Sequence, residues 1–450
     1  MKVKFFSLGC KVNSYENNAL KATLLCEGYE ITNEDNPDVV ILNTCSVTST
    51  ADQKSRQHIR KFKNNYPNAI IVVMGCYVQG NVDFVKEELN ADIIVGTSNR
   101  DKIPSLIKEF KQNKQQIVLV DTDPREFKYE ELGIASFSEN VRAYLKIQDG
   151  CDNFCSYCLI PLRRGKSRSR NKDDILKEAK SLVKKGYKEI VLTGIHVGGY
   201  GQDISDYSFS DLVEDLLKIK GLFRLRISSI EASEIDNKLI WLMLTKPNLA
   251  KHLHIPIQSG SSTVLKRMNR KYDAEQFIEK VNQIRYLMPD ICLTTDVIVG
   301  FPGESDKEFN ETVLSLVRCG FNMLHVFPFS PREGTVAYDM KEQIDPKIKD
   351  KRVKRLLDLS KKLWEQYTDR FVGKEVTVLI EEFDPEKKII KGHTSNYLEV
   401  SLRTDIDLVG QNVKTEYKKV WYSLTFLYFL RTCPKIFDLL RYISYNERAV

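Results

Sequence analysis

Three cysteines lie close together near the middle of the chain, at Cys151, Cys155 and Cys158. Their C-x3-C-x2-C spacing places three thiolates on one short loop. Thiolate sulfur is the soft ligand that iron–sulfur clusters prefer, and three thiolates bind three irons of a four-iron cubane. The fourth iron then stays open to a small molecule. This loop is therefore the strongest candidate for chemistry in the sequence.

A zinc knuckle or unrelated structural cysteines are the alternatives for the loop. A structural zinc site needs four ligands, and no fourth Cys or His lies near these three in the sequence. The spacing and the aromatic Tyr157 directly before the third cysteine favour a cluster of the radical S-adenosylmethionine type over zinc.

Three further cysteines follow predicted strands in the first part of the chain. Strands and helices alternate there, which indicates a parallel sheet. Because sites form beyond the carboxyl ends of such strands, we expect Cys10, Cys45 and Cys76 to converge on a second three-thiolate cluster. Each of them alone is typical of a buried structural cysteine, as are Cys26, Cys292 and Cys319. The predicted strands are 2–8, 39–43, 70–74 and 92–95, and the predicted helices are 14–27, 47–65 and 82–90.

The next region predicts a longer α/β array, an open and partial (β/α)6 barrel. Its cluster loop follows the first strand, at the face where barrel enzymes carry their chemistry. A domain boundary is expected within 123–137. The predicted strands are 143–148, 189–193, 224–228, 252–255, 292–299 and 323–327, and the predicted helices are 172–185, 209–219, 236–244, 274–287 and 305–319.

Residues after the second and fourth barrel strands are candidates for binding a cofactor. Glycine there lets the backbone approach a small ligand, although an ordinary turn explains the same residues. The candidates for contact with S-adenosylmethionine are Gly194, His196, Gly198, Gly199, His254 and Gln258.

The composition bounds the class of protein. The chain has 450 residues, ten cysteines and no signal-type leader, which suggests metal or redox chemistry in a reducing, cytoplasmic compartment. No apolar run approaches the ~20 residues that cross a bilayer. The net charge of +7 permits a polyanionic partner without requiring one.

A basic run follows the cluster loop; a solvated face and a nucleic-acid contact explain it equally well. Its arginines are Arg163, Arg164, Arg168 and Arg170.

Short strands are predicted after a basic helix near 347–367, at 375–381, 389–392, 397–402 and 412–417. They indicate a small β-barrel. The aromatic tail, 421–450, has no functional interpretation.

Taken together, these motifs resemble the methylthiotransferases, radical S-adenosylmethionine enzymes that insert sulfur and a methyl group into tRNA or a ribosomal protein. The resemblance implies an N-terminal domain over 1–125, a radical domain over 137–367 and an RNA-binding TRAM-like barrel over 371–420, followed by the atypical tail. The motifs that carry it lie at 8–13, 43–48, 75–76, 150–158, 163–170, 254–261 and 392–397.

The resemblance also implies the chemistry. Cys151, Cys155 and Cys158 would hold the cluster that cleaves S-adenosylmethionine, and the other trio would hold an auxiliary [4Fe-4S] cluster that supplies sulfur. External electron and sulfur donors are required. The partner would be the anticodon stem-loop of tRNA, with RNA contacts expected from the four arginines, His393 and Tyr397.

The Cys-Lys-Val-Asn sequence at 10–13 is similar to the branch of the family that acts on N6-threonylcarbamoyladenosine. The same chemistry on isopentenyladenosine or on a ribosomal-protein aspartate is the alternative. A third possibility is an RNA-binding or metal-storage protein without turnover, which would not cleave S-adenosylmethionine.

Overall fold

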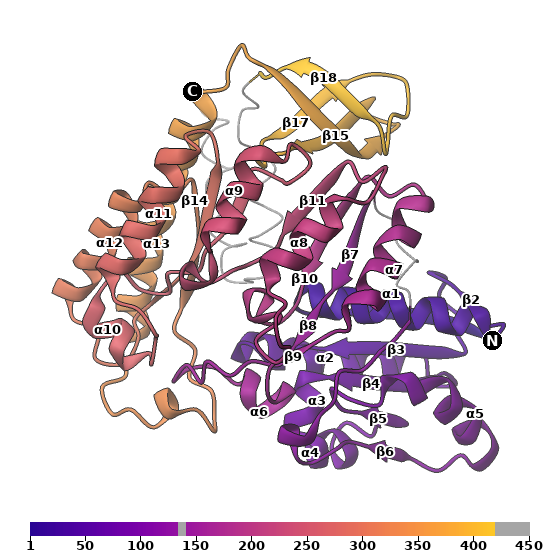
Figure 1. The fold of residues 1–450 in the computed structure, drawn as a ribbon. Helices are drawn as coiled ribbons and strands as arrows, with labels where there is room; N and C mark the ends of the chain where they lie inside the picture. Colours follow the sequence, from indigo (N-terminus) through magenta and orange to yellow (C-terminus); the bar gives the residue numbers. More distant parts are fainter. Residues whose placement is uncertain (134–140, 419–450) are drawn as a thin grey trace, which may run out of the picture.

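The computed structural model describes residues 1–133 and 141–418, which form three α/β and β regions along the chain (Figure 1). The predicted fold class is confirmed. The tail at 421–450 lies outside the described residues. Within the described part of the chain, no helix is long and apolar enough to span a bilayer.

The N-terminal region is a parallel six-stranded sheet of order β2-β1-β3-β4-β5-β6. The strands alternate side chains between two buried apolar clusters: Ile41 faces α1 and α5, whereas Leu42 faces α2, α3 and α4. The elements are β1 (Lys2–Ser7), α1 (Lys11–Cys26), β2 (Glu30–Ile31), β3 (Val39–Thr44), α2 (Ser49–Asn65), β4 (Ile70–Gly75), α3 (Cys76–Gly80), α4 (Val82–Glu87), β5 (Ile93–Val95), η1 (Arg100–Lys102), α5 (Ile103–Asn113), β6 (Ile117–Leu119) and η2 (Pro124–Glu126).

Helix α1 begins at Lys11, three residues before the predicted start at 14. The residue before the helix is Cys10, whose backbone is extended. Its carbonyl accepts the first helical hydrogen bond, from Ser14 N at 3.2 Å, so Ser14 lies inside the helix. Cys10 therefore lies directly before the first turn of α1.

The central region is a six-stranded partial barrel, as predicted. Two parallel sheets, β11-β10-β7 and β12-β13-β14, meet through a parallel bridge between Leu225 and Leu249. Helices cover the outside of the strands (Figure 1). The elements are β7 (Arg142–Lys146), β8 (Gln148–Asp149), α6 (Ile160–Arg164), β9 (Arg168–Ser169), α7 (Lys172–Lys184), β10 (Glu189–Thr193), η3 (Val197–Gly199), α8 (Phe209–Leu217), β11 (Arg224–Ile227), η4 (Ala232–Glu234), α9 (Asn237–Thr245), β12 (His252–His254), α10 (Ser262–Arg267), α11 (Ala274–Leu287), β13 (Cys292–Val299), α12 (Asp306–Cys319), β14 (Met323–Pro328), η5 (Val336–Tyr338) and α13 (Pro346–Asp369).

The C-terminal region is a curled antiparallel sheet of order β17-β16-β15-β18, half of a barrel. Its strands are β15 (Glu375–Asp384), β16 (Ile389–Thr394), β17 (Glu399–Arg403) and β18 (Asn412–Glu416).

The two outer regions contact opposite ends of the barrel strands. At the amino end of β11, Arg224 Nη1 donates to the His393 carbonyl at 3.2 Å. At the carboxyl end of β7, Lys146 Nζ donates to the Glu16 carboxylate at 3.1 Å. The N-terminal sheet therefore faces the end of the barrel that carries the cluster loop, and the C-terminal sheet covers the other end (Figure 1).

The carboxylate of Glu189 lies between the arginines that contact the C-terminal sheet. Its buried carboxylate accepts from Arg226 Nε at 2.7 Å and Arg224 Nη1 at 3.0 Å, and lies 3.6 Å from Arg142 Nε. Burial opposes ionisation of Glu189, but Arg226 and Arg142 outweigh it and lower its pKa from 4.5 to about 2.

A carboxylate with a lowered pKa stabilises the fold above its unfolded-state pKa, and this stabilisation is lost as the pH falls through the folded-state value. We therefore expect Glu189→Gln to lower the thermal midpoint at pH 7, and expect its difference from the unmodified protein to shrink between pH 4.5 and 2. Thermal unfolding across that range tests this. Glu375→Gln, in an exposed ion pair with Lys414, is the control and should match the unmodified protein. A difference that stays constant with pH would contradict the prediction.

Candidate cluster sites and the network between them

The topology brings Cys10, Cys45 and Cys76 together beyond the carboxyl ends of β1, β3 and β4. Gly9 has φ +102°, and a Cβ there would lie 2.7 Å from the Cys45 Sγ, so only glycine allows this approach. Burial, and then the neighbouring Cys76 and Cys10 thiols, raise the pKa of Cys45 to about 12. Cys45 and Cys76 are buried, whereas Cys10 is exposed.

The second trio lies on the loop after β8. Cys158 N donates to the Cys155 carbonyl at 3.0 Å, and Cys151 N donates to the Gly165 carbonyl at 3.0 Å. Ser156 anchors the loop to the end of α10, because its hydroxyl donates to the carbonyl of Arg267, the last residue of that helix, at 2.8 Å. Burial, and then the other two thiols of the trio, raise the pKa of Cys158 to about 12.

The donor chemistry of both trios fits iron–sulfur clusters. In the described residues, no three His, Cys, Asp or Glu side chains converge as ligands of a single metal ion do. A cubane binds each thiolate to a different iron, so its ligands surround the cluster instead of meeting at one point. With pKa values raised to about 12, Cys45 and Cys158 carry protons at neutral pH, and iron must displace them on binding.

Each trio has one thiol that accepts a hydrogen bond from a buried arginine. Arg164 Nε donates to the Cys76 Sγ at 3.2 Å, and Arg270 Nη1 donates to the Cys155 Sγ at 3.3 Å. Arg270 is held by an ion pair with Glu231. Both guanidiniums are positive charges placed against sulfur, which is the environment that stabilises a thiolate.

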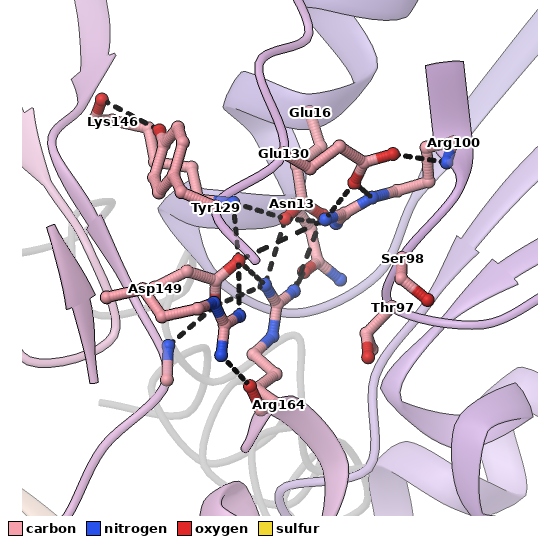
Figure 2. A network of polar contacts seen from close by, with 12 residues as sticks. Asn13, Glu16, Thr97, Ser98, Arg100, Tyr129, Glu130, Lys146, Asp149 and Arg164 are labelled. Atoms are coloured by element: carbon pink, nitrogen blue, oxygen red, sulfur yellow. Dashed lines mark hydrogen bonds and ion pairs between the residues drawn. The ribbon is translucent and has the colours of Figure 1, made fainter. Parts of the chain in front are cut away.

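A buried network of charged side chains joins the regions that carry the two trios (Figure 2). Glu16 of α1 accepts from Arg164 Nη1 at 2.9 Å and from Lys146 Nζ at 3.1 Å, and pairs with Arg100. Asp149 accepts from Lys146 Nζ at 2.6 Å and from Arg164 Nη1 at 3.1 Å. Burial opposes ionisation of Glu16, but its three cations outweigh it and hold its pKa well below the usual range. Its carboxylate therefore stays ionised in the interior.

The predicted RNA contacts of Arg164 and Arg170 are wrong. Their exposed fractions are 1% and 2%, and both side chains point into the protein. Arg170 pairs with Glu131 and Glu178, so its charge is neutralised inside the fold. A buried, paired guanidinium has no free donor for a phosphate.

The other predicted RNA contacts are only half-buried, and RNA binding by them stays a prediction. Tyr397 stacks on His252 with ring centroids 4.5 Å apart, and His393 Nδ1 lies 2.9 Å from Arg142 Nη2 of β7, so both face the barrel. Arg163 is held through its carbonyl, which accepts from Thr97 Oγ1 at 2.6 Å. Arg168 Nη1 donates to the Arg164 carbonyl at 2.7 Å.

The predicted S-adenosylmethionine contacts lie at the carboxyl ends of β10 and β12. His196 Nε2 lies 2.5 Å from the Glu234 carboxylate and within electrostatic range of the Cys151 thiol. A Cβ on Gly198 would lie 2.0 Å from Glu234 Oε2, and one on Gly199 would lie 2.7 Å from His196 Nδ1, so these glycines make room for the protein's own side chains.

The remaining three candidates for that cofactor are His254, Gln258 and Gly194, and each lies against other residues of the barrel. His254 Nε2 lies 3.2 Å from Asp296, and Gln258 has φ +61° and donates its backbone N–H to the Asp296 carbonyl at 2.9 Å. A Cβ on Gly194 would lie 3.1 Å from the Gln148 carbonyl. Cofactor contact by all six residues stays a prediction.

Lys11 directly follows Cys10; the residue is exposed, and its side chain ends in an ammonium. Within 1–133 and 141–418, no hydrogen bond or ion pair involves this ammonium. Loss of hydration of the ammonium among neighbouring protein atoms, and then the like charges of Arg226 and Arg142, lower the pKa of Lys11 to about 8. The side chain is therefore still mainly charged at neutral pH, beside a candidate cluster ligand and within electrostatic range of the barrel.

Sequence reasoning missed several residues of this region. Arg270 lies 115 positions from Cys155, and no local pattern relates the two. Glu16 and Asp149 look like ordinary charged residues on a helix and beside a loop. Burial next to opposite charges, which only the assembled fold reveals, is their common feature.

Comparisons with known proteins match both regions that carry the cysteine trios. A family model described as the radical SAM superfamily matches residues 145–316, and one described as the uncharacterized protein family UPF0004 matches residues 2–96. Among solved structures, the radical S-adenosylmethionine methyltransferase TsrM from Kitasatospora setae has a TM-score of 0.56 at 14% identity, covering 72% of each chain. That likeness concerns the fold alone.

Curated relatives match nearly the whole chain. "Threonylcarbamoyladenosine tRNA methylthiotransferase MtaB" of Bacillus subtilis is 43% identical over 93% of this chain and 94% of its own. The Aquifex aeolicus protein of the same name is 36% identical over 92% of this chain and 99% of its own. A "tRNA-2-methylthio-N(6)-dimethylallyladenosine synthase" of Acetivibrio thermocellus is also 36% identical, over 92% of this chain and 88% of its own.

Proposed function

Because the chain belongs to the tRNA methylthiotransferase family of radical S-adenosylmethionine enzymes, we propose that it converts N6-threonylcarbamoyladenosine next to the tRNA anticodon, at position 37, to its 2-methylthio derivative. The family implies S-adenosylmethionine and a [4Fe-4S] cluster. Two clusters, external electron and sulfur donors, and a cytoplasmic location are parts of the same proposal.

The ammonium of Lys11, which has no hydrogen-bond or ion-pair partner in the described residues, is the observation that favours this substrate. The names of the relatives give two substituents on adenosine, threonylcarbamoyl and dimethylallyl. The first ends in a carboxylate, whereas the second is a hydrocarbon. A cation with no protein partner in the described residues, beside a candidate ligand of the sulfur-donating cluster, suits an anionic substituent and disfavours an apolar one.

The proposed mechanism assigns a task to each group of residues. Cys151, Cys155 and Cys158 would hold the cluster at which S-adenosylmethionine is cleaved, and the N-terminal trio would hold the auxiliary cluster. When bound, these groups supply the radical that activates the adenosine C2 position and the sulfur that is inserted there. Ser156 fixes the central loop to α10. The N-terminal sheet and the barrel would shield the bound substrate from water. The proposed domains remain 1–125, 137–367 and 371–420, with the C-terminal sheet binding the anticodon arm.

Nucleoside mass spectrometry tests the function. Reconstituted enzyme, reductant, a sulfide source and S-adenosylmethionine are incubated without oxygen with tRNAs that carry one adenosine modification each. Methylthio product on the threonylcarbamoyl form alone is the expected result. Product on the isopentenyl form alone would replace the proposed substrate. Absence of product on both, with 5′-deoxyadenosine still formed, would contradict the tRNA substrate and favour a protein substrate.

We expect Lys11→Met to reduce kcat/KM on threonylcarbamoyl-tRNA by about 10- to 100-fold, equivalent to one charge-assisted hydrogen bond of about 1.5–3 kcal/mol. Iron content should stay unchanged. The matched control is Lys21→Met on the same helix, where the ammonium lies 5.7 Å from the centroid of the Phe5 ring. Equal losses in both variants would contradict a specific role for Lys11.

A further inference from the structure

A single buried guanidinium contacts the segments that carry both cysteine trios (Figure 2). Arg164 Nε donates to the Cys76 Sγ at 3.2 Å, and Nη1 donates to Glu16 at 2.9 Å and to Asp149 at 3.1 Å. The remaining nitrogen, Nη2, donates to the Asn13 side-chain oxygen at 3.2 Å. All three guanidinium nitrogens therefore have partners.

These partners come from different segments of the chain. Asn13 and Glu16 lie on α1, the helix that begins directly after Cys10. Asp149 lies two positions before Cys151, and Arg164 ends α6, just after the central trio. A planar group with fixed donor directions holds its acceptors in a defined arrangement. Arg164 thus fixes the N-terminal cysteine loops relative to the central cysteine loop.

The surrounding charges leave part of the Arg164 charge available to sulfur. The network contains three carboxylates, Glu16, Glu130 and Asp149, and four basic side chains, Arg100, Lys146, Arg164 and Arg168. The positive charges exceed the negative ones by one, and a thiolate at Cys76 adds a negative charge at the edge of this set that offsets the excess. A charged hydrogen bond to a cluster sulfur withdraws negative charge and makes the cluster easier to reduce.

The central trio has a separate arginine. Arg270 Nη1 donates to the Cys155 Sγ at 3.3 Å, and Arg270 is paired with Glu231 and donates to Tyr272. None of these contacts reaches Cys10, Cys45 or Cys76. The two arginines therefore allow a reciprocal experiment in the same protein.

From this geometry, and resting on the proposed cluster ligands, we propose that Arg164 is a positioning residue. It connects the loops of the two clusters and raises the reduction potential of the auxiliary cluster through its hydrogen bond to Cys76. Arg270 has the corresponding effect on the central cluster alone.

Reduction potentials of the full-length, cluster-loaded protein test the proposal. Anaerobic redox titration followed by electron paramagnetic resonance is performed on Arg164→Gln, Arg164→Lys and Arg270→Gln. Each is measured in the unmodified chain and in a Cys155→Ala background, which isolates the auxiliary cluster. Arg164→Gln should shift the auxiliary potential to a more negative value, and Arg164→Lys should shift it less. Arg270→Gln should leave the auxiliary potential unchanged and shift the central one.

Arg352→Gln is the control for general destabilisation, because Arg352 is also buried and donates to the Glu304 carboxylate at 2.6 Å. None of its hydrogen bonds within the described residues goes to a cysteine. The variant should change neither potential. Loss of only the auxiliary cluster in both Arg164 variants, with circular dichroism unchanged, also supports the proposal. An unchanged auxiliary potential, or equal shifts in the Arg164 and Arg352 variants, overturns it. If the unmodified protein binds four irons instead of eight, the cluster assignment fails as well, which separates the two proposals.

Discussion

Cys155→Ala is expected to abolish the reductive cleavage of S-adenosylmethionine to 5′-deoxyadenosine, down to the detection limit. A cubane needs its three protein thiolates to present an open iron to the cofactor. Cys45→Ala, in contrast, should preserve cleavage and lose sulfur insertion, because Cys45 belongs to the other trio. Anaerobic assays of 5′-deoxyadenosine and of methylthionucleoside, made on the same samples, separate the two effects.

Cys26→Ser is the matched control for this pair. Cys26 is the last residue of α1 and is exposed, and it belongs to neither trio. The variant should retain both products and the iron content of the unmodified protein. Normal methylthiolation by Cys45→Ala would show that the N-terminal trio does not hold the sulfur-donating cluster.

Glu16→Gln is expected to have the largest effect on stability, about 3–5 kcal/mol, because it removes one partner from a buried set of ion pairs. Glu16 is fully buried and pairs with Arg100, Arg164 and Lys146. The amide keeps the shape but leaves these cations without their shared negative charge. Its lowered pKa means that the stabilisation persists at neutral pH and disappears only in strong acid.

Urea unfolding at pH 7, performed without oxygen, measures the effect of Glu16→Gln. The control is Glu275→Gln, which removes an exposed pair with Arg318 and should leave the midpoint unchanged. Equal midpoints for Glu16→Gln and the unmodified protein would mean that the network does not stabilise the contact between the N-terminal sheet and the barrel.

The alternation of strands and helices predicts most of the fold, and the cysteine pattern predicts the two candidate cluster sites. The C-x3-C-x2-C spacing is local, so the loop needs no tertiary information. The convergence of Cys10, Cys45 and Cys76 follows from topology, since parallel strands end at one edge. The start of α1 was placed too late because a cysteine at the position before a helix gives no side-chain capping signal.

The sequence by itself determined which residues bring thiolates to two places in this protein. The tertiary structure decided what the charged residues do. A run of arginines looks the same whether its partners are phosphates or buried carboxylates. Arg164 is internal because Glu16, 148 positions away in the sequence, packs against it. Arg170 is internal because Glu131, 39 positions away, pairs with it. The residue type gives the sign of a charge, but the ion-pair partner of that charge depends on which distant segments the fold buries together.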